Sequence, residues 1–197
     1  MNKSFETLIE SLMLLPGIGK RSAERIAFYI INHKDEGLKI GGSIIDAVNK
    51  IRNCSICGNI TESDICNICA DKNRERKTIC IVENIQDLLA IENTGIYKGL
   101  YHITGGLISP LDKIGPEKLR MEELFHRLSE GVEEVIIALK ATTEGEATSH
   151  YIKERIKKMG LNLKLTRIAI GIPVGGDIDL TDKLTIINAI TNRKEIQ

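Results

Sequence analysis

The sequence predicts a multi-domain α/β chain in which a parallel sheet with crossover helices follows a helical segment and a cysteine-rich segment. Apolar residues recur at helical spacing up to about residue 53, and from Thr78 onward short β-rich runs alternate with amphipathic helical patterns. Four cysteines in paired C-x-x-C spacing stand between these regions. Because the hydrophobic period changes at these points, the predicted parts are 1–53, 54–77, 78–168 and 169–197.

The composition argues against several classes of protein. A chain of 197 residues, 42% of them hydrophobic, buries roughly 70% of its unfolded surface, which argues against disorder and a small disulfide scaffold. Lys+Arg and Asp+Glu number 27 each, so bulk positive charge alone does not hold DNA or an acidic membrane. No apolar run approaches the ~18 residues that cross a bilayer and the N-terminus lacks a signal pattern, so we expect a cytoplasmic protein without membrane contacts.

Three helices are expected in residues 1–53, because three groups of apolar residues repeat at helical spacing. The groups are Phe5, Leu8, Ile9, Leu12 and Met13, then Ala23, Ile26, Ala27 and Ile30, and then Ile44, Ile45, Val48 and Ile51. The turn Leu15-Pro16-Gly17-Ile18-Gly19 separates the first two, which suggests a helix-hairpin-helix.

In such a hairpin, glycines bring backbone N–H groups and a helix N-terminus close to a phosphate, without regard to base sequence. The cations Lys20, Arg21 and Arg25 follow the turn and would neutralise that phosphate. The segment therefore predicts DNA or RNA phosphate binding. A plain helix connector with a solvated basic face, or a surface for self-association, is the alternative.

The cysteine pairs predict a zinc site. Cys54 and Cys57 form one C-x-x-C loop, and Cys66 and Cys69 form another eight residues further on. Four thiolates match a closed tetrahedral zinc site, which leaves no position for a substrate and is therefore structural. A redox C-x-x-C or unconnected buried cysteines are the alternative. The fifth cysteine, Cys80, lies in a strand pattern and is expected to be a small buried hydrophobe.

The region from residue 78 predicts a parallel sheet whose crossovers are helices. Candidate strands are Ile79–Val82, Leu100–Ile103, Val135–Leu139 and Leu163–Ile168, with helical patterns near 85–93, 117–130 and 146–159. We expect residues 71–77 to form a polar connector, and the last stretch to form a Gly/Pro-rich loop followed by a short helix. The four histidines are scattered, and we expect them to be structural.

Four acids follow the ends of predicted strands: Glu83, Asp87, Glu144 and Glu146. Because the ends of parallel strands meet at one edge of a sheet, these carboxylates could converge and hold Mg²⁺. The alternative is that they stabilise helix N-termini, which needs no metal. The chain has no P-loop, zincin or α/β-hydrolase motif.

Taken in order, these features resemble the RecR family of bacterial recombination mediators from end to end. The matching stretches are the hairpin with Ser22-Ala23, the cysteine quartet, Ile81-Val82-Glu83, Gly105–Asp112, Glu144–Thr148 and Gly171–Asp177. The resemblance implies a helix-hairpin-helix domain, a four-cysteine zinc finger, a Toprim domain and a C-terminal tail. It also implies a role with RecO and RecF in loading the recombinase at single-stranded gaps.

The resemblance further implies a ring-like tetramer, built through both ends of the chain, that clamps DNA. A ring multiplies a few phosphate contacts, which would let a neutral chain hold DNA. By motif position, Arg21 and Arg25 look like the family's DNA-contacting cations, beside which we place Lys20. Glu83, Asp87, Glu144 and Glu146 match Toprim acidic positions that are associated in this family with partner binding and not with strand cleavage.

The sequence departs from the family pattern just before the second acidic pair. Lys140-Ala141-Thr142 stands where the family usually carries Asn-Pro-Thr. A lysine at this position could pair with Glu144 or Glu146, which weakens the case for Mg²⁺. We therefore expect a repair scaffold that is not an enzyme. The rivals are a Mg²⁺-dependent Toprim nuclease or strand-passing enzyme, which lacks an evident nucleophile, and a zinc-bearing adaptor that never touches DNA.

Overall fold

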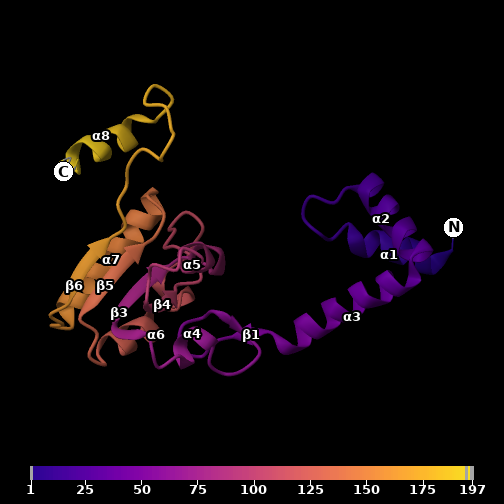
Figure 1. Cartoon of the computed structure of the whole chain (residues 1–197), viewed down its shortest axis with the longest axis horizontal. Coiled ribbons are helices and arrows are strands. Elements are labelled where there is room, and N and C mark those ends of the chain that lie inside the picture. The colour runs from indigo at the N-terminus through magenta and orange to yellow at the C-terminus, as the bar shows by residue number, and fades with distance from the viewer. Residues whose placement is uncertain (1, 194, 196–197) are drawn as a thin grey trace. The chain divides into compact units, whose positions relative to one another are not determined.

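The computed structural model describes residues 2–193 and 195, and the chain divides into two compact units. The units are Met1–Ile51 and Arg52–Gln197. In Figure 1 the first runs from indigo to purple, and the second continues through orange to yellow. Each unit is described by itself below.

The N-terminal unit consists of α1 (Lys3–Leu12), α2 (Lys20–Asn32) and α3 (Lys34–Lys50). The Asn2 side chain caps α1 by accepting a hydrogen bond from the backbone N–H of Ser4 (3.0 Å). The core of this unit is small: Ile9, Ala23 and Ala27 are buried, with Phe5, Leu8, Leu12 and Ile18 packed around them. The expected pair of helices joined by the turn at residues 15–19 is thus confirmed.

The third helix begins at Lys34, well before the apolar group from which it was predicted. Only His33 separates it from α2. Asp35 and Glu36 occupy its first turn, where negative charge stabilises a helix N-terminus. Gly37, Gly41 and Gly42 interrupt the apolar period there, which explains why the sequence pattern did not reveal this part of the helix.

The second unit contains a four-stranded parallel sheet in the order β4-β3-β5-β6, and its parallel character is as predicted. The strands are β3 (Glu75–Val82), β4 (Gly99–Ile103), β5 (Glu134–Ala138) and β6 (Lys164–Arg167), and the crossover helices are α5 (Ile85–Glu92), α6 (Met121–Leu128) and α7 (Thr143–Lys158). The first strand is longer than expected, because Glu75 pairs with Gly99. Its first residues come from the segment that we interpreted as a connector.

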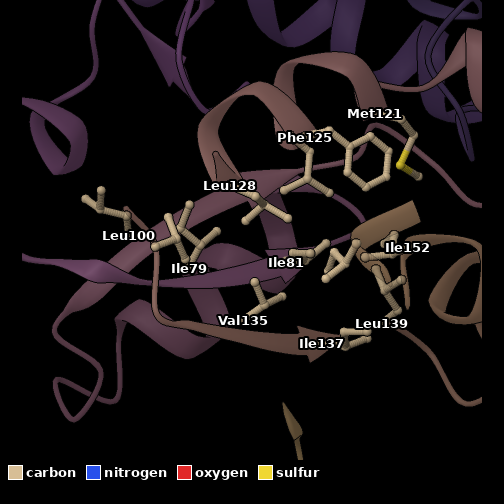
Figure 2. Close-up of a cluster of buried hydrophobic side chains, with 13 residues drawn as sticks. Ile79, Ile81, Leu100, Met121, Phe125, Leu128, Val135, Ile137, Leu139 and Ile152 are labelled. Carbon is tan, nitrogen blue, oxygen red and sulfur yellow. The ribbon is translucent and has the colours of Figure 1, made fainter. Parts of the chain in front are cut away.

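The sheet is buried on both faces, which is typical of parallel sheets. Ile79 and Ile81 of β3 belong to a cluster with side chains of α6 and α7, whereas Cys80 and Val82 belong to a second cluster with Leu88 of α5. Figure 2 shows the first cluster, where side chains of β3 and β5 meet those of α6 and α7. Cys80 is 2% exposed, and burial raises the pKa of its thiol to about 12, so it packs as the expected small hydrophobe.

Shorter elements complete the second unit. The cysteine segment contains an antiparallel pair, β1 (Arg52–Asn53) and β2 (Ile60–Thr61), and the short helix α4 (Asn67–Ala70). A 3₁₀ turn, η1 (Pro116–Lys118), precedes α6, and the tail ends in the predicted helix α8 (Lys183–Thr191), which Asp182 caps. Within residues 2–193 and 195, no helix combines the length and hydropathy of a membrane span.

Candidate metal centre and nucleic-acid interface

The four predicted zinc ligands come together in space. Cys54, Cys57, Cys66 and Cys69 are all buried, and their sulfur atoms lie within 4.8 Å of one another. The Sγ atoms of Cys57 and Cys66 are 3.6 Å apart. A tetrahedron with Zn–S bonds of ~2.3 Å has edges of about 3.8 Å, so the quartet has the size of a zinc site.

Backbone hydrogen bonds shape both loops of the quartet. The N–H of Gly58 donates to the carbonyl of Cys54 (3.0 Å), and the N–H of Ala70 donates to the carbonyl of Cys66 (3.0 Å). Gly58 has φ +81°, a conformation that side chains disfavour, and a Cβ there would lie 3.1 Å from Arg120. This glycine therefore permits both the turn and its close packing.

The electrostatics of the quartet favour a dication. The hydrogen bond between Cys57 and Cys66 raises the pKa of Cys57 to about 12 and lowers the pKa of Cys66. A bound Zn²⁺ supplies the charge that lets all four ionise, and it then acts as a cross-link.

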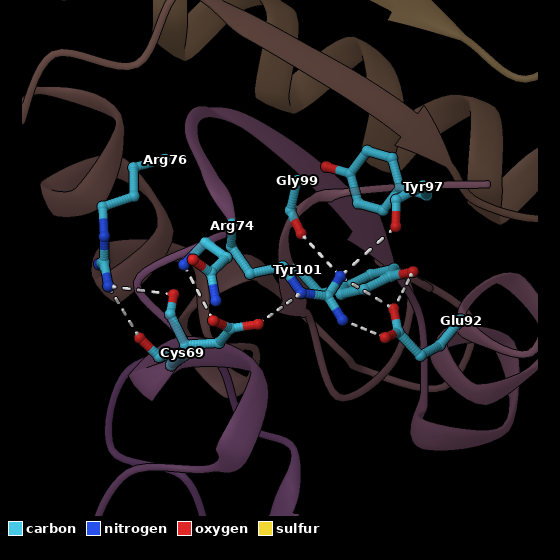
Figure 3. A network of polar contacts seen from close by, with 9 residues as sticks. Cys69, Arg74, Arg76, Glu92, Tyr97, Gly99 and Tyr101 are labelled. Carbon is cyan, nitrogen blue, oxygen red and sulfur yellow. Dashed lines mark hydrogen bonds and ion pairs between the residues drawn. The ribbon is translucent and has the colours of Figure 1, made fainter. Parts of the chain in front are cut away.

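The cysteine segment is joined to the sheet by direct hydrogen bonds. The N–H of Ile103, at the end of β4, donates to the carbonyl of Cys57 (2.8 Å). The Arg120 side chain donates through Nη2 to the carbonyl of Ser55 (3.2 Å), and Arg76 donates to the carbonyl of Cys69 (3.3 Å; Figure 3). The metal centre therefore supports the edge of the sheet where β4 ends.

A second polar network holds the start of the sheet. Arg74 forms an ion pair with Glu92 of α5 and donates to the carbonyls of Tyr97 (3.4 Å) and Gly99 (3.3 Å; Figure 3). The hydroxyl of Tyr101 donates to Glu92 (3.0 Å). The hydrogen bond from Arg74 holds the pKa of Glu92 below its usual range. Sequence patterns contained no signal for this network, because its members are far apart in the chain.

The hairpin cations are exposed, as a phosphate-binding surface requires. Lys20 and Arg21 lie in the first turn of α2, and Arg25 lies one turn later on the same helix. Among the residues that the structure describes, none forms an ion pair with these three. Gly17 adopts φ +80°, which lets the chain turn sharply from α1 toward α2.

The predicted acids lie at the carboxyl-terminal edge of the sheet, but they do not gather around a common point. Glu83 follows β3 and forms an ion pair with Lys140 (3.0 Å), and Glu146 forms one with Arg167 (2.7 Å). Asp87 lies in the first turn of α5, and Glu144 in that of α7. In the described part of the chain, the cysteine quartet is the only group of three or more possible ligands within metal-binding reach.

The carboxylates therefore do not fit a Mg²⁺ site in this arrangement. The expected partner of Lys140 also needs correction, because the lysine contacts Glu83 and not Glu144 or Glu146. Residue 82 pairs with residue 138 between the adjacent strands β3 and β5, which brings the residues after both strands together. The adjacency of these strands, and not the spacing in the sequence, determines the pairing.

His102 is structural, as expected. It is fully buried, its Nε2 lies 2.7 Å from the carbonyl of Arg120, and Arg127 approaches its Nδ1 at 3.2 Å. Burial, and then the charge of Arg127, lowers the pKa of His102 to about 3. The imidazole therefore stays neutral at ordinary pH and links β4 to α6.

Comparison with known proteins matches four parts of the chain to family models, three of RecR and one of the Toprim domain. The matched models describe a RecR helix-hairpin-helix over residues 5–48, a RecR zinc finger domain with four cysteines over 51–71, a Toprim domain over 77–169 and the RecR C-terminal region over 171–194. The recombination protein RecR of Heliobacterium modesticaldum is 44% identical over 191 residues, covering 96% of this chain and 95% of that protein. The chain belongs to the RecR family.

Membership in the RecR family confirms the resemblance and the predicted fold class. The cysteine quartet is a structural zinc site, since its geometry and the matched RecR zinc finger domain agree. Sequence reasoning missed Arg74, Arg120 and Arg167. Arg74 holds the start of the sheet, Arg120 contacts the zinc finger, and Arg167 contacts the acidic edge. The assignment of DNA contacts to Lys20, Arg21 and Arg25, and of partner contacts to the acids, stays a prediction.

Proposed function

We propose that this chain is a DNA-binding mediator of recombinational repair that is not an enzyme. It binds single- and double-stranded DNA without sequence preference, works with RecO and RecF to load recombinase at single-stranded gaps, and acts as a ring-shaped clamp. The observation that carries the proposal is the N-terminus of α2, where free backbone donors and three exposed cations occur together.

The start of α2 has the properties of a phosphate site. The first backbone hydrogen bond of the helix runs from the N–H of Ala23 to the carbonyl of Gly19 (2.9 Å), so the N–H groups of residues 20–22 remain available. No acidic side chain occupies this first turn. The helix dipole, the free donors and the cations all favour an anion here, and none of them distinguishes one base from another.

Self-association explains how a chain without net charge holds DNA. In α3 the apolar side chains of Leu38, Ile44, Ile45 and Val48 are exposed, and in the tail Leu180 and Leu184 are exposed. Such surfaces are typical of residues that a second copy of the chain covers. Assembly through both ends gives a ring in which each subunit adds its own cationic hairpin.

The acidic edge is the proposed contact surface for RecO. Glu146 and Lys140 are exposed there, and Glu83 and Glu144 are partly exposed. A mixed set of charges at a sheet edge suits a partner whose surface carries the complementary charges. Such complementarity contributes more to specificity than to affinity.

The proposal that the chain is not an enzyme rests on the acids and the tyrosines. Glu83 and Glu146 are each paired with a cation. Tyr97 donates to the carbonyls of Thr78 and Leu100, and burial raises its pKa, so it is a poor nucleophile. Burial and the hydrogen bond to Glu92 raise the pKa of Tyr101 likewise. Magnesium-dependent nicking of supercoiled DNA that Glu83→Gln abolishes would support the rival nuclease instead.

DNA binding at low salt tests the proposed surface. The double variant Arg21→Ala and Arg25→Ala is expected to weaken binding at least tenfold and to flatten the dependence of log Kd on log salt by roughly one to two units per subunit. Lys157→Ala with Lys158→Ala removes the same charge from exposed positions at the far end of α7 and serves as the control. Unchanged affinity in the hairpin variant would show that the surface is wrong, and absence of salt-sensitive binding by the intact protein would favour an adaptor that does not touch DNA.

A further inference from the structure

The acidic edge of the sheet contains its own cations. Four strands end there, and three of them carry a charged residue at or just after their ends. Glu83 follows β3, Lys140 follows β5, and Arg167 ends β6, so one acid and two cations lie along this edge. The ion pairs Lys140 with Glu83 (3.0 Å) and Arg167 with Glu146 (2.7 Å) connect neighbouring parts of this edge. A Toprim acidic edge would otherwise be a place to look for a divalent ion.

The two ion pairs involve cations from different strands. Val82 pairs with Ala138 at the ends of the adjacent strands β3 and β5, so Glu83 lies beside the residues that follow β5. Ile137 pairs with Arg167, so the guanidinium that contacts Glu146 comes from β6, on the other side of β5. Arg167 also donates to the hydroxyl of Ser149 (3.2 Å), which fixes its direction along α7. Glu83 and Glu146 are therefore attached to different cations from different strands.

We infer that Lys140 is the built-in counter-ion of Glu83 and excludes a divalent metal from this edge of the sheet. The Glu83 side chain is only 18% exposed, and its Oε2 faces the lysine ammonium, so a metal ion would have to displace that ammonium first. Because the lysine is part of the chain, its effective concentration beside Glu83 is fixed, and a metal ion must compete with it at any metal concentration.

The electrostatic surroundings of Lys140 agree with this role. The close contact with the Glu83 carboxylate (3.0 Å) and its charge raise the pKa of Lys140, and the charge of Asp87 raises it further. The ammonium is therefore protonated throughout the pH range in which Mg²⁺ or Mn²⁺ binds carboxylates. The inference concerns metal exclusion by the chain alone, and it holds or fails independently of DNA binding and of RecO.

Titration of the zinc-loaded full chain with Mn²⁺, followed by the electron paramagnetic resonance signal of the free ion, tests the inference. The wild type is expected to show no saturable Mn²⁺ site, and Lys140→Ala is expected to create one. The gain in affinity should be roughly 30-fold, the size expected for removing a unit charge about 4 Å from a divalent ion in water. Mg²⁺ should compete at the same site.

Three variants complete the design. Lys140→Arg keeps the positive charge and should behave like the wild type, whereas Lys140→Ala with Glu83→Gln should lose the new site. Lys158→Ala, which removes an exposed lysine at the other end of α7, should gain nothing. Thermal unfolding verifies that each variant folds. Saturable binding by the wild type as tight as that of Lys140→Ala, or no gain in folded Lys140→Ala, would overturn the inference.

Discussion

The N-terminal unit and the sheet unit differ in how much of their apolar surface they bury. In the sheet unit, 13 buried side chains of strands, helices and loops form one cluster, and a second cluster covers the opposite face. In the N-terminal unit the buried core is Ile9, Ala23 and Ala27, and none of residues 34–50, which form α3, is buried.

The difference indicates that the two units have different sources of stability. In the second unit, the sheet is stabilised by its own core, the zinc finger and the polar networks, and among the described residues of that unit only the C-terminal tail exposes a comparable set of apolar side chains. The N-terminal unit exposes apolar residues along α3 that a helix in water would not retain without a partner, which agrees with assembly. The following predictions test this contrast, from the largest expected effect to the smallest.

Loss of zinc is expected to have the largest effect, and it should act on the sheet unit. Cys57→Ser removes one ligand, and in zinc-finger peptides metal binding contributes about 10 kcal/mol or more to folding. Because the N–H of Ile103 donates to the carbonyl of Cys57, amide exchange should accelerate at the end of β4 as well as in residues 54–69.

The measurements are zinc content and hydrogen exchange. Cys80→Ala is the matched control, since this buried cysteine lies outside the quartet and its variant should retain one zinc per chain. Unchanged exchange at Ile103 in Cys57→Ser would mean that the zinc finger and the sheet are not coupled.

Truncation of an isoleucine should lower the free energy of unfolding in the sheet unit, but should weaken self-association in the N-terminal unit. Ile81 is fully buried in the sheet, and Ile81→Ala should lower the free energy of unfolding by about 3 kcal/mol without changing the assembly. Ile45 is 63% exposed on α3, and Ile45→Ala should change the stability of the subunit by less than about 0.5 kcal/mol but reduce the mass of the assembly.

Denaturant titration and light scattering measure the two effects. If Ile45→Ala lowered subunit stability as much as Ile81→Ala and left the mass unchanged, the contrast between the units would be incorrect.

Acid should destabilise the sheet unit through His102. The pKa of His102 is about 3 in the fold, below the value of ~6.5 in an unfolded chain, so the unfolded chain binds a proton that the folded chain does not. Stability is therefore lost as the pH falls from about 6.5 toward 3, and the loss at pH 5 should be about 2 kcal/mol.

The slope of stability against pH distinguishes this effect from a general weakening. His102→Gln should flatten the slope between pH 7 and 5 even if it lowers stability at every pH. His126→Gln, which changes an exposed histidine of α6, is the comparison variant. An unchanged slope in His102→Gln would assign the acid sensitivity to other groups.

The sequence predicted most elements of the fold, because their signals are local. The runs that became β3, β4 and β5 contain short apolar stretches, and the run that became β6 alternates apolar and polar residues. The two C-x-x-C pairs encode their own turns. The start of α3 was missed because glycines interrupt its apolar period, and the start of β3 because polar residues pair there with β4. In α3 the helix continues through the glycines despite their low helix propensity, and in β3 pairing with β4 extends the strand into polar residues.

What the sequence determined by itself is the set of parts and their chemistry: three helices, a zinc ligand set, a parallel sheet and a cationic hairpin. What only the tertiary structure decided is which charges meet. Lys140 contacts Glu83 because β5 lies beside β3, and Arg167 contacts Glu146 because β6 lies beside β5. The order of strands in a sheet is not the order in the chain, so the pairing of charges at its edge follows from the packing of the strands and not from residue spacing.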